Sequence, residues 1–357
     1  MSVHRALATL VSCACALACP RAMDDAGLDA ADERVPAETT ADTAADDKVV
    51  GVVDGANGAA LAAALGAAMT ASLPSRDDGA AVLDLATGRL LAVHHTDVVF
   101  ARPISPGSVM KPFTAVALLE HDDADPAIAC HGSHRDAHGA ERGCWLHDGH
   151  GAIRLRTAIA SSCNVYFYER AAALDDAHLL DVFRRFGLGE PLHPSLTGAR
   201  RDEIPIAVAH SDVVDVAVGD DVSLLVTPIS LLRAVTPFAT RGSLVEPSRD
   251  GSGGQRRVSV RAADLARVDE GLRAAPREGT LQGVFADDDV AAKTGTAKRV
   301  SQRSTRGLVV GYAPVDAPEI AFVVVRDRGR GARDAGPAAR AIVDTWRAHT
   351  ALARGAP

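Results

Sequence analysis

Three short, widely spaced motifs hold the residues of this chain that could do chemistry. Ser108 precedes Lys111 by three positions. Ser162 precedes Asn164 by two, and Lys293 opens the tripeptide Lys-Thr-Gly. On a helix, residues three apart share a face, so we expect Lys111 to lie one turn beyond Ser108, under its hydroxyl. If burial lowers its pKa, the neutral Lys111 amine can accept the serine proton, which would make Ser108 a nucleophile.

Lysine is rare in this chain, which strengthens the signal of these motifs. Of the 38 Lys and Arg residues, the four lysines are Lys48, Lys111, Lys293 and Lys298. A composition that favours arginine this strongly would supply arginine wherever only a positive charge was needed. Arginine cannot release its proton at working pH, whereas a desolvated lysine can. The lysines in the first and third motifs therefore indicate a need for a removable proton.

Length and composition bound the fold and exclude some functions. A chain of 357 residues with 47% hydrophobic residues can build one large domain or two small ones. Beyond the N-terminal region the charge is near neutral, no basic face stands out, and aromatic residues make up 4%. These features argue against nucleic-acid binding.

The N-terminal region is typical of an exported protein. A short basic head and an apolar run predict a signal peptide at residues 1–19. Cys13 and Cys19 both follow small residues in a way that loosely resembles lipoprotein cleavage sites, so a lipid anchor to the membrane stays open. Residues 20–48 are interpreted as a disordered tether, because the stretch 24–48 holds nine acidic residues against only two basic ones, Arg34 and Lys48. The remaining stretch, 49–357, is expected to be the folded domain.

Hydrophobic periodicity and turn residues predict strands near both ends of this domain and helices between them. Both groups of strands are expected to join one sheet, with the middle helices as a second lobe and a cleft at the junction. The expected strands are 79–85, 89–94, 290–297, 307–313 and 319–326. The expected helices are 59–73, 108–120, 155–174, 179–186, 228–240 and 335–349, with a loop at 130–151.

The motifs also resemble those of a known family. Residues 105–113 read Ser-Pro-Gly-Ser-Val-Met-Lys-Pro-Phe, and residues 293–297 read Lys-Thr-Gly-Thr-Ala. With Ser-Cys-Asn at 162–164 and Gly-Tyr-Ala-Pro at 311–314, these stretches are similar to the transpeptidase domain of class B penicillin-binding proteins, especially the elongation type. The resemblance runs from about residue 79 to residue 346.

The resemblance implies a fold and a set of roles. The fold is a mixed α/β (α+β) one of the serine β-lactamase and transpeptidase type, with a mainly antiparallel sheet flanked by helices and a helical lobe. Ser108 would be the nucleophile and Lys111 its base, while Ser162 would relay a proton to the leaving amine. Asn164 would bind the substrate backbone. The terminal carboxylate would be held by Lys293, Thr294 and Thr296, and Gly295 would let the substrate approach the strand closely.

A second constellation contains Cys130, Cys144, His150 and Cys163. In an oxidising compartment one reading is a Cys130–Cys144 disulfide with Cys163 as a buried thiol. The other reading is a structural zinc ion bound by all four residues, since some elongation-type relatives place metal ligands at aligned positions. In neither interpretation does catalysis require a cofactor.

These observations predict a periplasmic or cell-envelope serine D,D-acyltransferase, either a transpeptidase or a carboxypeptidase. It would act on D-Ala-D-Ala stem peptides of peptidoglycan through a Ser108 acyl-enzyme, and β-lactams would inhibit it covalently. A serine β-lactamase and a non-hydrolytic sensor or scaffold are the alternatives. The sequence names no protein partner.

Overall fold

The computed structural model describes residues 56–136, 139–207, 213–285, 289–298 and 304–354. The predicted signal peptide and acidic tether lie outside the described residues. Internal contacts separate residues 1–44 from residues 45–357, and the structural description below concerns the second unit alone. Across the described ranges, no helix has the length and apolar character needed to cross a lipid bilayer.

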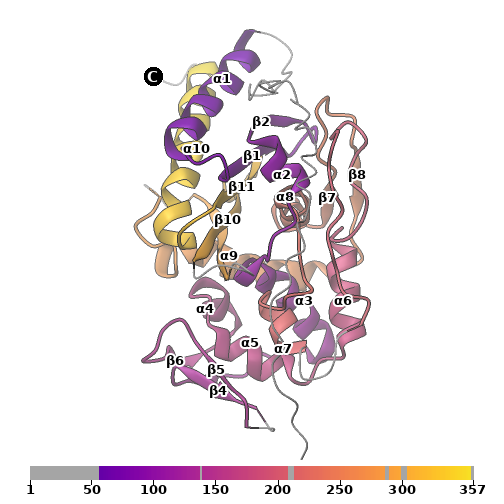
Figure 1. Ribbon diagram of the computed structural model, residues 1–357, viewed down its shortest axis with the longest axis vertical. Coiled ribbons are helices and arrows are strands. Elements are labelled where there is room, and N and C mark those ends of the chain that lie inside the picture. The colour runs from indigo at the N-terminus through magenta and orange to yellow at the C-terminus, as the bar shows by residue number, and fades with distance from the viewer. Residues whose placement is uncertain (1–55, 137–138, 208–212, 286–288, 299–303, 355–357) are drawn as a thin grey trace, which may run out of the picture. The chain divides into compact units, whose positions relative to one another are not determined.

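A five-stranded antiparallel sheet lies at the centre of this unit (Figure 1). In spatial order its strands are β2 (Leu90–His94), β1 (Gly79–Asp84), β11 (Ile320–Arg326), β10 (Thr305–Ala313) and β9 (Ala291–Lys298). Strand β1 pairs directly with β11, and Val82 lies opposite Phe322. The two ends of the domain therefore share one sheet, as the sequence predicts.

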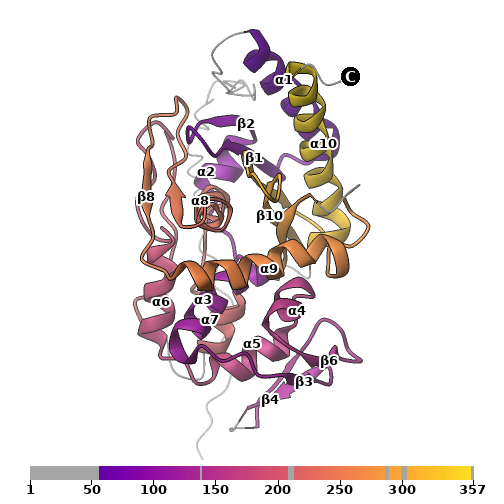
Figure 2. The same ribbon diagram turned by 180° about the vertical axis from the view of Figure 1, so that it is seen from behind.

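Two helices, α1 (Ala56–Ser72) and α10 (Gly336–Ala353), pack side by side over one face of the sheet (Figures 1 and 2). Side chains alternate between the two faces of a strand, so every second residue points toward this helical layer. Val82 and Val324 are fully buried on this face and share a hydrophobic cluster with Trp346 of α10. This layer anchors the sheet on the side away from the catalytic motifs.

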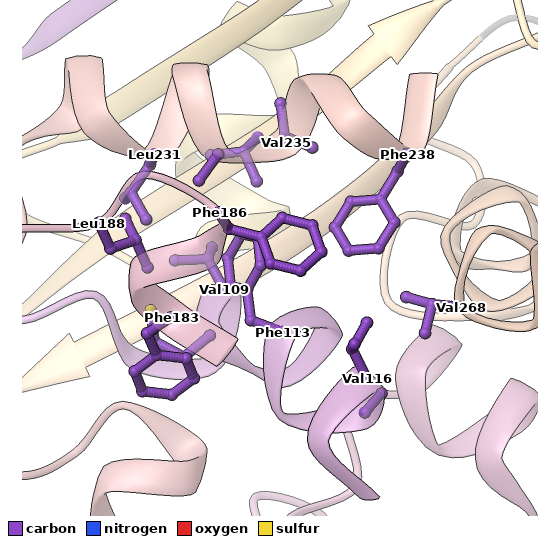
Figure 3. Close-up of a cluster of buried hydrophobic side chains, with 14 of the residues drawn as sticks. Val109, Phe113, Val116, Phe183, Phe186, Leu188, Leu231, Val235, Phe238 and Val268 are labelled. Carbon is purple, nitrogen blue, oxygen red and sulfur yellow. The ribbon is translucent and has the colours of Figure 1, made fainter. Parts of the chain in front are cut away.

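The opposite face is covered by α8 (Pro228–Ala239), while α9 (Ala262–Glu278) packs along β9. Figure 3 shows the core on this side, where three phenylalanine rings meet. Phe186 stacks on Phe238 with ring centroids 5.2 Å apart and meets Phe113 edge-on at 5.1 Å. Since Phe113 belongs to the helix that follows the nucleophile motif, this cluster fixes that helix against the sheet layer.

Most of the remaining helices form the second lobe (Figure 2), together with two of the three short two-stranded sheets that the structure describes, whereas α2 and the third short sheet lie beside the large sheet. The helices here and at the junction are α2 (Thr96–Ala101), η1 (Gly107–Met110), α3 (Lys111–Asp122), α4 (Leu155–Ala160), α5 (Asn164–Ala171), α6 (Asp176–Arg185) and α7 (Val213–Val218), and η2 (Gly331–Ala335) precedes α10. The paired short strands are β3 (Ile128–Cys130) with β6 (Gly151–Ile153), β4 (Ser133–Arg135) with β5 (Glu141–Gly143), and β7 (Ser243–Val245) with β8 (Gln255–Arg257).

The structure confirms the expected mixed α/β fold and corrects three local predictions. The helix expected over 155–174 is two helices, α4 and α5, because Ser162 between them adopts a left-handed φ of 55°. The stretch 130–151, expected as a loop, contributes short strands to two hairpins. The 17-residue helix α9 was not expected at all. It packs against α4 at Gly271, where an added Cβ would lie 2.6 Å from Ile159.

Candidate active site

Ser108 lies in a tight 3₁₀ turn that leads into α3. The helix expected from Ser108 therefore begins only at Lys111, and Pro112 takes a position in its first turn, where no backbone donor is needed. The preceding Gly107 has a φ of 55° and donates its N–H to Gly219 O at 3.0 Å. Gly219 must be glycine, because an added Cβ would lie 2.2 Å from the Gly107 carbonyl oxygen. These contacts fix the backbone of the half-buried Ser108.

Lys111 is completely buried, and burial is the main cause that lowers its pKa to about 8. Its Nζ donates to the Ser162 carbonyl oxygen at 2.8 Å and to Asn164 Oδ1 at 2.5 Å. Among the described residues, Ser108 Oγ is not a hydrogen-bond partner of this amine, although the spacing predicts proximity. Hydrogen bonds of this kind often tighten only when substrate binds. A pKa near 8 leaves a useful neutral fraction of the amine at physiological pH.

Ser162 lies between the two buried lysines. Its Oγ accepts a hydrogen bond from Lys293 Nζ at 2.8 Å and lies 3.4 Å from Lys111 Nζ. The left-handed backbone of Ser162 ends α4 and turns its hydroxyl toward both amines. The second motif is therefore the bridge between the first and the third.

Lys293 is also fully buried. Its Nζ donates to Ser162 Oγ at 2.8 Å and to the Thr294 carbonyl oxygen at 2.9 Å. Its expected role in binding a substrate carboxylate stays a prediction. Burial, and then the nearby charge of Lys111, hold the pKa of Lys293 well below its usual range. The structure thus makes Lys293 a partner of Ser162.

Asn164 is the first residue of α5, and both the oxygen and the nitrogen of its side-chain amide form hydrogen bonds. Its Oδ1 accepts from Lys111, and its Nδ2 donates to the Gly143 carbonyl oxygen at 3.2 Å. These bonds fix the orientation of the side chain at the edge of the cleft. Asn164 therefore links Lys111 to the hairpin that ends at Gly143.

Strand β9 carries the predicted substrate-binding residues. Thr294 Oγ1 lies 2.9 Å from Thr280 Oγ1, a contact that the sequence analysis did not predict. The exposed Thr296 accepts a hydrogen bond from the Gly331 N–H at 3.1 Å. Gly295 also has a packing role. A Cβ there would lie 2.9 Å from the Pro106 carbonyl oxygen, so glycine lets the nucleophile segment pack against the strand.

The four predicted metal ligands come together in a compact cluster. One donor atom from each lies within 4.8 Å of the others, and His150 Nδ1 is 3.5 Å from Cys130 Sγ and 3.7 Å from Cys144 Sγ. The three cysteines are buried and free. A hydrogen bond with Cys163 is the main cause that lowers the pKa of the Cys144 thiol. A tetrahedral zinc ion with Zn–S distances of about 2.3 Å fits this donor set and its spacing.

The cluster is tied to the catalytic bridge through the chain itself. Cys163 lies between Ser162 and Asn164, and the Trp145 Nε1–H donates to the Ser161 carbonyl oxygen at 2.9 Å. A group bound to the cysteines would therefore restrain the turn that carries the second motif.

Comparisons with known proteins agree with this geometry. The family described as "Penicillin binding protein transpeptidase domain" matches residues 51–345. The peptidoglycan D,D-transpeptidase MrdA of Acinetobacter baumannii is 26% identical over 282 residues, which cover 68% of this chain and 42% of that protein. The chain thus spans less than half the length of this relative.

Solved structures with 18–19% sequence identity share the fold. Penicillin-binding protein A from Mycobacterium tuberculosis, solved as a ceftriaxone acyl-enzyme complex, superposes with a TM-score of 0.70 over 80% of this chain and 77% of that one. PBP2 from Helicobacter pylori, solved in complex with MreC, gives a TM-score of 0.71 over 81% and 62%. The match over residues 51–345 shows that this chain belongs to the penicillin-binding protein transpeptidase domain family.

Proposed function

We propose that this protein is a penicillin-binding serine D,D-acyltransferase that acts on D-Ala-D-Ala stem peptides of peptidoglycan. The observation that carries the proposal is the pair of fully buried lysines, Lys111 and Lys293, whose amines meet at the hydroxyl of Ser162 beside the nucleophile segment. Burying two amines is costly, and it is useful where a neutral amine must move protons.

In the proposed first step, Ser108 Oγ attacks the carbonyl carbon of the penultimate D-Ala while its proton passes to neutral Lys111. The tetrahedral intermediate then expels the terminal D-Ala, whose amine receives a proton through Ser162. The product is an ester between Ser108 and the stem peptide. An amine of a second stem, or water, attacks this ester and regenerates the serine, which gives transpeptidation or carboxypeptidation.

Strand β9 would hold the substrate beside the nucleophile. The side chains of the exposed Thr296 and of Thr294 would contact the terminal carboxylate of the stem or of a β-lactam. The backbone N–H groups of Ser108 and Thr296 are our candidates for the oxyanion donors. Lys293 would then act indirectly, by fixing the Ser162 hydroxyl.

We also propose a structural zinc ion held by Cys130, Cys144, His150 and Cys163. The closed donor set supports a role in stability, because four protein ligands leave no open coordination position. When bound, zinc would hold the cysteines as thiolates and brace the segment from Ser162 to Asn164. Catalysis would require no cofactor.

The place of action would be the cell envelope, where peptidoglycan is assembled. The relatives that carry D,D-transpeptidase names and the predicted signal peptide support this proposal. The proposal includes a periplasmic location and a lipid anchor to the membrane. β-Lactams would be covalent inhibitors, as in the acyl-enzyme structure of the mycobacterial relative. Because PBP2 of Helicobacter pylori is solved in complex with MreC, a protein similar to MreC is a candidate partner.

One experiment tests the central proposal. Purified protein is incubated with fluorescent penicillin, and the covalent adduct is followed over time by gel fluorescence and intact-mass spectrometry. We expect one stable adduct on Ser108. A protein that forms no adduct would refute the proposal, and an adduct that hydrolyses within seconds would favour a β-lactamase.

A further inference from the structure

A cavity of about 490 Å³ lies beside the catalytic motifs. Gly143, Trp145 and Tyr168 are among its lining residues, as is Asn164. Under the proposed function Asn164 binds the peptide backbone of the donor, so this cavity adjoins the acyl part of the substrate. It therefore has the position of a subsite for a side chain that precedes the D-Ala pair.

Most charges along this cavity are already neutralised within the protein. Arg142 donates to Asp215 through Nε at 2.9 Å and Nη2 at 3.1 Å, and to Asp136 at 2.8 Å. Glu141 accepts from Arg135 at 2.6 Å. These groups are structural ion pairs, so they leave little net charge for a ligand.

Two further charged residues, Asp220 and Lys298, line the same cavity. Within the described residues, neither side chain has a hydrogen bond or an ion pair, with each other or with a third group. Both are exposed to solvent. They interact electrostatically across the cavity without making contact, which leaves an anion and a cation available to a ligand.

The backbone fixes where each of these charges lies. Asp220 follows Gly219, whose carbonyl oxygen accepts the Gly107 N–H, and its own N–H donates to Asp215 O at 2.9 Å. Lys298 ends β9 two residues after Thr296, so strand alternation puts both side chains on the same side of the sheet. The hydrogen bond from Gly107 to Gly219 thus holds the segment of Asp220 beside the nucleophile segment, and Lys298 belongs to the substrate-binding strand itself.

The surroundings of Asp220 favour a cationic ligand group. Although the side chain is reached by solvent, enclosure by protein is the main cause that raises the pKa of its carboxyl group, and Lys111 and Lys298 oppose the rise. An ammonium group placed beside Asp220 would replace lost hydration and favour the ionised form.

We propose that this cavity binds the stem-peptide side chain next to the D-Ala pair and selects one that ends in both an ammonium and a carboxylate group. Asp220 contacts the ammonium and Lys298 the carboxylate. A side chain with an amine alone would satisfy Asp220 but place like charge near Lys298, and a neutral side chain would use neither. This inference rests on the proposed function, because it needs a stem peptide as the donor.

The expected discrimination is modest, because both charges are partly solvated. An ion pair at such a position is worth up to about fivefold in binding or in kcat/KM. We therefore expect the wild-type protein to prefer the zwitterionic side chain over a simple amine by up to about fivefold.

The test uses synthetic D-Ala thioester donors whose preceding residue is a diamino-dicarboxylic acid, lysine or acetyl-lysine. For each protein variant, kcat/KM of thiol release is calculated per mole of protein that forms a benzylpenicillin adduct, which corrects for the amount of folded protein. It is then divided by the second-order rate constant of benzylpenicillin acylation, which corrects for any general change in the reactivity of Ser108. Asp220→Asn should lower this ratio by up to about fivefold for the two donors that carry an ammonium. Lys298→Gln should lower it only for the diamino-dicarboxylic donor.

Glu141→Gln is the matched control, since Glu141 lines the same cavity but is paired with Arg135. Its ratios should equal those of the wild type. Equal wild-type ratios for the three donors would overturn the inference, and so would a loss in Glu141→Gln as large as in Asp220→Asn. A protein that forms no penicillin adduct would refute the proposed function itself, which keeps the two failures distinct.

Discussion

Replacing Lys111 by arginine or by methionine tests whether this residue acts as a base. The amine is completely buried, and its pKa falls from 10.5 to about 8. This fall means that the protein disfavours the charged form of the amine, relative to the neutral form, by about 3 kcal/mol. Arginine keeps the charge but cannot release the proton, and methionine keeps the approximate length without the charge. We expect both variants to acylate ~100- to 10,000-fold more slowly, which is the usual contribution of a general base.

The assay is the second-order rate constant for acylation by fluorescent penicillin, measured from pH 6 to pH 10. Since only the neutral amine can accept the serine proton, the wild-type rate should rise about tenfold per pH unit below the pKa of Lys111 and level off above about 8. Both variants should lose this rise. The methionine variant controls for folding, because it does not bury an unpaired charge.

Two outcomes would contradict this reasoning. If the arginine variant acylated at the wild-type rate, charge alone would matter at this position. If the methionine variant kept the pH profile with its rise toward pH 8, another group would be the titrating base.

The remaining predictions concern the nucleophile, the third motif, the glycine contact and the metal. Ser108→Ala should abolish covalent penicillin labelling, and a labelled variant would show that another residue is the nucleophile. Lys293→Ala should slow acylation by ~100-fold with an unchanged fold by circular dichroism, because Ser162 loses its 2.8 Å partner; normal acylation with a lower Tm would make Lys293 structural. Gly219→Ala should lower Tm by several degrees and slow acylation together, since its Cβ would overlap the Gly107 carbonyl oxygen; a variant with wild-type Tm would contradict this contact. A strong chelator should remove about one zinc per chain, lower Tm and slow acylation, whereas sensitivity to reductant without bound metal would favour the disulfide.

The large elements of the fold could be predicted from the sequence because their patterns are local. The strands near both ends alternate or are continuously apolar, and their positions agree with the structure within about two residues. Helix α9 was missed because Gly271 and Pro276 are unfavourable inside helices, although Leu265, Val268 and Leu272 recur at helical spacing. Its existence depends on packing against α4 and β9, which no short window of sequence contains.

The site was predictable as a set of residues but not as a set of contacts. The motif spacing identifies Ser108, Lys111 and Lys293, and the structure places the two lysine amines at the Ser162 hydroxyl. The sequence could not show that Lys293 Nζ donates to Ser162 Oγ. It also gave no reason to single out Gly219, because a lone glycine has no signature until the segment it contacts is known.

The cysteine cluster is best understood through the strained turn that it flanks. Ser162 has a φ of 55°, and for a residue other than glycine the left-handed conformation costs about 1–2 kcal/mol. Something must offset this cost, because a relaxed turn would swing the Ser162 hydroxyl away from both lysines. The Cys163 N–H bonds to Ala158 O at 3.0 Å, and Trp145 holds the Ser161 carbonyl oxygen. A metal bound through the Cys163 side chain would supply a further restraint at the next residue, so a structural site would affect the chemical step through the backbone conformation of Ser162.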